Sequence, residues 1–182
     1  IFIMKTTLKI FALSVALFAF SNISFGQGNT AEATATAGAN IITPIGITVD
    51  AGSKLQFGDL IATSSDYKVT IAPDGTRTST GDAAFFTTTG FSAVSFTVTG
   101  EAGAAFSITL PEDETIDLTG DGNDMALTDF TSSVGLSSSI NGTAGSYNSG
   151  SKTFTVGATL SVGENQAAGQ YSATFDVTVA YE

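Results

Sequence analysis

The chain contains no cysteine, no histidine and no tryptophan among its 182 residues. Without cysteine no disulfide can cross-link the fold, so stability must come from burial and strand pairing. Without histidine and cysteine the chain also lacks the usual base near neutral pH, the thiolate nucleophile and the common zinc ligands. The lack of tryptophan argues against a glycosidase cleft lined by aromatic rings. We therefore predict a protein that is not an enzyme and has no catalytic residue.

Basic residues are scarce as well. Six lysines and arginines stand against 17 acidic residues, which gives a net charge of −11 at pH 7. Nucleic acids and anionic lipid surfaces are bound by clustered lysine and arginine, which displace counterions from phosphates. The basic residues beyond the N-terminal segment are few and scattered: Lys54, Lys68, Arg77 and Lys152. We expect neither nucleic acid nor a membrane surface as a partner.

The N-terminal segment has the pattern of a signal peptide. Two lysines after Met4 precede the apolar run Ile10–Phe20, and small residues come just before Gln27. The run is much shorter than the roughly 20 residues that cross a bilayer as a helix, and a signal anchor is the alternative. We predict that residues 1–26 comprise a cleaved signal peptide with upstream residues. The mature protein would be periplasmic, surface-bound or extracellular, without membrane insertion, and its net charge would be −13.

Apolar residues in the remaining chain recur at every second position, which is typical of half-buried strands. Phe91–Thr99 and Ala104–Leu110 alternate in this way around a glycine-containing turn, so we predict that they form a β-hairpin. Lys152–Val162 and Tyr171–Tyr181 alternate over longer stretches. We predict that these two strands also pair, with residues 163–169 as the connection.

Further strands have shorter patterns. Pro44 places the first of them at a sheet edge or at a bend, and Asp74–Gly75 marks a turn. The segments are Ile41–Val49, Leu55–Phe57, Tyr67–Ile71, Ala84–Thr88, Met125–Phe130 and Val134–Ile140. Many short strands without a helical pattern predict one all-β domain over residues 27–182, an immunoglobulin-like antiparallel β-sandwich. A closed β-barrel is the alternative.

Acidic side chains gather in one part of the chain. Residues 117–124 place oxygen ligands at positions one, three and five and a glycine at six, as in a calcium loop, but Thr119 and Thr128 replace expected ligands. We favour a solvated acidic loop over a metal site, and we assign no metal or cofactor residue. The cluster consists of Glu112, Asp113, Glu114, Asp117, Asp121, Asn123, Asp124 and Asp129.

Phe85 and Phe86 are adjacent on an expected strand, so their side chains must face opposite sides and one of them is a candidate for exposure. An exposed aromatic ring and the acidic loop together motivate an alternative function. The protein would then be a secreted module that binds a glycan or calcium.

Several segments carry a resemblance to a known family. The closing run, residues 168–181, reads Ala-Gly-Gln-Tyr-Ser-Ala-Thr-Phe-Asp-Val-Thr-Val-Ala-Tyr, and earlier segments contribute to the likeness: Ala31–Ala37, Ile42–Ile45, Leu55–Gly58, Phe96–Gly100, Phe106–Pro111 and Phe154–Leu160. Over nearly all of the mature chain the sequence resembles the secreted bacterial domain of unknown function 4402. Its closing run is also similar to the ends of spore coat protein U and of archaic chaperone-usher pilins.

The resemblance implies an outer-surface role and transfers no catalytic residue. The likeness to pilins implies an incomplete sandwich that accepts an extended strand from another subunit. The donor would be Thr30–Val49, with residues 27–40 as a flexible or donor-strand lead-in; alternatively this segment is the domain's own first strand. We expect a structural or adhesive surface subunit whose partners are itself or other surface subunits.

Overall fold

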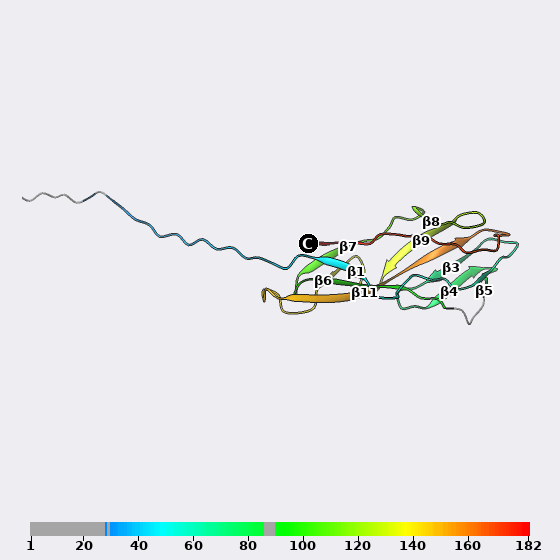
Figure 1. Cartoon of the computed structure of the whole chain (residues 1–182), viewed down its shortest axis with the longest axis horizontal. Coiled ribbons are helices and arrows are strands. Elements are labelled where there is room, and N and C mark those ends of the chain that lie inside the picture. The colour runs from blue at the N-terminus through cyan, green and yellow to red at the C-terminus, as the bar shows by residue number, and fades with distance from the viewer. Residues whose placement is uncertain (1–27, 29, 86–89) are drawn as a thin grey trace, which may run out of the picture. The chain divides into compact units, whose positions relative to one another are not determined.

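The computed structural model describes residues 28, 30–85 and 90–182 and divides the chain into two units, residues 1–39 and 40–182. In the first unit the described residues form no strand and are all exposed. The second unit consists of antiparallel strands, and its described residues contain no helix (Figure 1). The strands are β1 Gly46–Val49, β2 Leu60–Ile61, β3 Tyr67–Ile71, β4 Arg77–Gly81, β5 Ala84–Phe85, β6 Val94–Glu101, β7 Ala105–Thr109, β8 Ile116–Leu118, β9 Met125–Ser132, β10 Ser137–Ser139, β11 Ser149–Val162 and β12 Thr178–Tyr181.

The larger sheet is organised by its longest strand, β11 (orange in Figure 1). The first half of β11 pairs with β6 and the second half with β3, while β9 pairs on its other side. The change of partner falls at Gly157, where a Cβ atom would collide with the carbonyl oxygen of Ile71. Glycine is therefore required there, because two backbones approach closely. The sheet is completed by β1 beside β6, β4 beside β3 and β8 beside β9.

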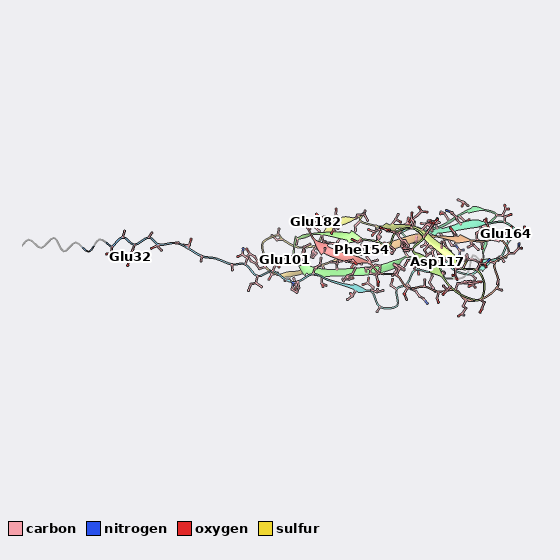
Figure 2. All side chains as sticks on the ribbon, turned by 90° about the horizontal axis from the view of Figure 1, so that it is seen from above. Glu32, Glu101, Asp117, Phe154, Glu164 and Glu182 are labelled. Carbon is pink, nitrogen blue, oxygen red and sulfur yellow. The ribbon has the colours of Figure 1, made fainter. Side chains whose placement is uncertain are left out.

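A smaller sheet in the order β10-β7-β12 packs against the first half of β11. The core between the two sheets has its centre at Phe154, whose ring stacks on Phe96 with centroids 5.6 Å apart. We call this the sheet-covered core; its buried residues are Val94, Phe96, Val98, Phe106, Ile108, Ile140, Phe154 and Val156. Figure 2 shows Phe154 between the ribbons of the two layers. Both sheets end on free edges, so the described residues form an open sandwich and the closed alternative is wrong.

A second core lies along the other half of β11. Its buried residues are Phe57, Tyr67, Val69, Ile71, Met125, Leu127, Ala158, Leu160 and Val162. Opposite this part of the large sheet the chain forms little regular structure. The core is covered there by segments 54–62 and 166–172, which contain only the two-residue strand β2 among the described strands. We call it the loop-covered core.

Both predicted strand pairs are wrong in their pairing, although their alternation is confirmed. β6 and β7 belong to different sheets, and so do β11 and β12. The turn after Glu101 leads the chain from one sheet to the other, with Gly103 at a φ of 77°. A strand paired within a sheet and a strand facing it across the core bury the same alternate residues, so the pattern does not distinguish the two arrangements.

The shorter strands were predicted with mixed success. Tyr67–Ile71 is strand β3, Asp74–Gly75 turns the chain into β4, and Met125–Phe130 lies within β9. The prediction at Leu55–Phe57 reduces to one bridge between Gln56 and Ser92. Val134–Ile140 contains only the short β10, because Gly135 has a φ of 74° and the chain turns there. Of Ala84–Thr88, only the first two residues are described, as β5.

Candidate functional site

The two sheets present free edges to each other along one side of the sandwich. Among the strands that the structure describes, β1 pairs only with β6, and β12 pairs only with β7. No backbone hydrogen bond joins β1 to β12 within the described part of the chain. We call these two edges, residues 43–49 and 173–181, the open seam. Pro44 precedes β1, and β1 is an edge strand, as the proline predicted.

One part of the open seam has no backbone partner at all. Ala173–Val177 forms no backbone hydrogen bond with any other described segment, although Ser172 before it bridges Thr119 and Thr178 after it pairs with Thr109. The stretch partly continues the alternation of β12: Phe175 and Val177 are half-buried, whereas Ala173, Thr174 and Asp176 are exposed. A strand with unpaired N–H and C=O groups is a template for pairing with another chain.

The side chains beneath the open seam are apolar and only partly covered. Those that pack on the sheet-covered core are Ile45, Ile47, Phe175, Val177, Val179 and Tyr181. Phe175 is fixed by the ring of Phe130, with centroids 5.1 Å apart. Next to the seam, Ile41 is 90% exposed and Ile42 is 53% exposed. An added strand with apolar residues at alternate positions could cover these groups.

One end of the open seam is held by a polar clasp. The Tyr181 hydroxyl donates to the carbonyl oxygen of Thr43 at 2.7 Å and accepts from the Glu101 amide at 2.6 Å. The Thr43 amide donates to Glu101 Oε2 at 3.1 Å, and Glu101 is only 6% exposed. Figure 2 shows Glu101 and Glu182 toward the same end of the domain. The clasp ties the segment before β1 to the C-terminal end of β12.

The other end of β1 is anchored by Asp50. Its carboxylate accepts hydrogen bonds from the hydroxyls of Ser95 and Thr97 on β6, the latter at 2.7 Å. These hydrogen bonds lower the pKa of Asp50 below its ordinary value, because they stabilise the charged form. The Asp50 amide also donates to the Ser95 carbonyl, so β1 is fixed to β6 at both ends.

The acidic loop of residues 117–124, whose spacing partly matches a calcium loop, is mostly exposed and is tied to neighbouring segments. Asp117 lies on β8, Thr119 bridges Ser172, and the carbonyl of Asn123 accepts from the Gln166 side chain. Among the residues that the structure describes, no three acidic side chains are close enough together to hold a metal ion. Asp113 Oδ1 accepts from the Asp129 amide at 2.6 Å, a bond within the protein.

The predicted exposed aromatic lies at the limit of the described residues. The backbone of Phe85 pairs with Leu60 in the β2–β5 ladder, and Phe86 lies outside the described residues, as does the predicted signal peptide. No helix in the described part of the chain is long and apolar enough to cross a membrane.

A family model described as Domain of unknown function (DUF4402) matches residues 47–181. The chain belongs to this family. The match begins in β1 and ends at the last residue of β12, so it covers residues 47–49 of the first edge of the open seam and all of the second edge. No curated protein and no solved structure matches the chain. The predicted strands Ile41–Val49 and Tyr171–Tyr181 are regular only over Gly46–Val49 and Thr178–Tyr181. Their unpaired edges could not be predicted, because an alternating pattern reports burial and not pairing.

Proposed function

We propose that this member of the DUF4402 family is an exported, non-enzymatic subunit of the bacterial cell surface, structural or adhesive, that assembles by β-strand addition. The observation that carries the proposal is the unpaired stretch Ala173–Val177 at the edge of the smaller sheet. Its backbone groups and the half-buried side chains beside it offer a site for one extended strand.

The donor proposed for this site is the N-terminal segment of another copy of the chain. Gly46–Val49 is already paired as β1, so of Thr30–Val49 only residues before Gly46 remain for donation. Residues 30–39 form no strand, their side chains are exposed, and alanine alternates with glutamate and threonine over Ala31–Ala37. The alternation is suited to an extended strand with one light apolar face.

Export and the lack of enzymatic activity are proposed from the sequence. The apolar run Ile10–Phe20 supports a signal peptide, and N-terminal sequencing of the secreted protein should begin at Gln27. The absence of histidine and cysteine from the chain supports a role without nucleophilic catalysis.

Assembly is tested by comparing residues 27–182 with a chain that starts at Asn40. Light scattering after gel filtration and electron microscopy should show oligomers or fibres of the longer chain and monomers of the shorter one. A longer chain that stays monomeric at all concentrations, and is unaffected by the deletion, would contradict the proposal.

The site of addition is tested by disulfide trapping, because the natural chain has no cysteine that would interfere. One cysteine is scanned through residues 31–37 and the second replaces the exposed Thr174. Oxidation should give a ladder of linked chains that collapses on reduction. The matched control is Ser137→Cys on β10, the opposite edge of the same sheet, which should not be linked. Equal linkage at residues 137 and 174 would show that contact is random.

A further inference from the structure

A cavity of about 1020 Å³ opens at the loop-covered core; its described lining residues lie outside the open seam, although Ser172 directly precedes the second seam segment. It lies between segments 54–62 and 166–172, over the core residues Tyr67, Met125 and Leu160. Binding sites for small molecules commonly have volumes of about 300–1,000 Å³. The cavity therefore has room for a ligand of several rings.

Aromatic rings supply part of the cavity wall. Phe57, Tyr67 and Tyr171 line it, and the two tyrosine hydroxyls are engaged within the protein. Tyr67 donates to the Ile61 carbonyl at 2.9 Å and Tyr171 to the Ala167 carbonyl at 2.8 Å. These bonds hold the two tyrosine rings in place. Phe57 and Tyr67 are almost fully buried, so the half-buried Tyr171 offers the most ring surface to a ligand.

Amide side chains supply the polar part of the wall. Gln56, Gln166 and Gln170 line the cavity. Gln166 is only 8% exposed; its Nε2 donates to the carbonyl of Asn123, and its Oε1, which is itself buried, has no hydrogen-bond partner among the described residues. A buried acceptor without a donor is unfavourable. A ligand hydroxyl group would remove this penalty if the Gln166 side chain turned its Oε1 toward the cavity.

Charge is nearly balanced in the cavity, although the chain carries a net charge of −11. Among the described residues that line the cavity, only Lys54 and Asp59 are charged, and their signs are opposite. An anionic ligand would need clustered cations, and a cationic ligand would need several carboxylates. A purely apolar ligand would leave the glutamine amides without partners.

We infer that this cavity binds a neutral saccharide. A neutral sugar combines hydroxyl groups, which pair with amides, with apolar C–H faces, which pack on aromatic rings, and it carries no charge. The inference concerns a different part of the fold from the open seam and does not depend on assembly by strand addition.

The test uses residues 27–182 and an array of neutral oligosaccharides, followed by NMR titration of the isotope-labelled protein with each hit. Chemical-shift changes should centre on Gln56, Gln166 and Tyr171. A tryptophan in place of the exposed Ala168 would fill the cavity and should weaken binding at least about tenfold. The matched control, Ala51→Trp, lies in an exposed turn outside the cavity lining and should leave affinity unchanged.

The role of Gln166 is tested separately by Gln166→Met, which keeps the length of the side chain and removes its amide; affinity should fall about fivefold or more. Thermal unfolding of each variant identifies any that is misfolded. If Gln166→Met is misfolded, the affinity of Ala168→Trp decides the test. An array without hits would overturn the inference. Shifts confined to residues outside the cavity, or binding of a synthetic peptide of residues 28–42 in the cavity instead of a sugar, would overturn it as well.

Discussion

The two cores along β11 are built from one strand but differ in what covers them. A second sheet lies over Phe154 in the sheet-covered core, whereas segments with little regular structure lie over Leu160 in the loop-covered core. Facing sheets interdigitate their side chains at close to crystal density. Irregular segments pack less regularly, and the large cavity lies on their side. The comparison teaches that one half of this sandwich provides stability and the other half has room for a ligand.

The largest expected effect comes from truncating the centre of the sheet-covered core. Phe154→Ala should lower the free energy of unfolding by about 3–5 kcal/mol, because the fully buried ring leaves a cavity that facing sheets cannot close. Phe57→Ala in the loop-covered core should lose less, since Phe57 already borders an open cavity. Urea unfolding measures both. Equal losses would show that the two cores are equally well packed.

The junction between the cores gives the next effect. Gly157→Ala should lower the free energy of unfolding by about 1–3 kcal/mol, because the new methyl group would meet the Ile71 backbone. The control is Gly163→Ala, just beyond β11, where the new Cβ would come no closer than 3.5 Å to Gln166 Oε1. An equal loss of stability in the two variants, measured by thermal unfolding, would contradict the close approach of β11 and β3 at Gly157.

The clasp of the open seam is expected to contribute less. Tyr181→Phe removes the hydroxyl that bonds the Thr43 carbonyl and the Glu101 amide. Because Tyr181 is only half-buried, the free energy of unfolding should fall by about 0.5–1.5 kcal/mol. Hydrogen exchange should accelerate at the Glu101 amide. Tyr147→Phe, at a residue that is 53% exposed, is the matched control and should have almost no effect. If Tyr181→Phe left both the free energy of unfolding and the hydrogen exchange unchanged, other contacts would hold this end of the open seam.

The smallest expected effect is a pH dependence at the other end of β1. The pKa of Asp50 is lowered by hydrogen bonds from Ser95 and Thr97, so its ionised form stabilises the folded state above the ordinary pKa of 3.8. That contribution is lost as the pH falls through the lowered pKa. The melting temperature of the natural protein should therefore exceed that of Asp50→Asn at pH 7, and the difference should shrink toward pH 2.

Other carboxylates titrate in both of these proteins, so their effects cancel in the difference. Asp82→Asn, at an exposed residue between β4 and β5, is the matched control and should change little at either pH. A difference between the natural protein and Asp50→Asn that stays constant with pH would contradict the role given to Asp50.

Much of the fold could be predicted from apolar residues that recur at every second position. Tyr67–Ile71 was placed correctly because three alternate side chains are buried and the turn Asp74–Gly75 follows. β4 was missed, since its threonines and serine are mostly exposed and it is held only by pairing with β3. The cavity was missed for a similar reason, because it is formed by Gln56 and Gln166, which lie far apart in the chain.

The sequence by itself determined which face is buried in the strands with an apolar alternation, and the absence of histidine and cysteine determined which side-chain chemistry the chain lacks. Only the tertiary structure decided which strands pair. Phe154 and Val179 show the same alternation whether they lie in one sheet or face each other across a core, since burial depends on the face and pairing depends on the edge. An unpaired edge at Ala173–Val177 is therefore visible only after every strand has been placed.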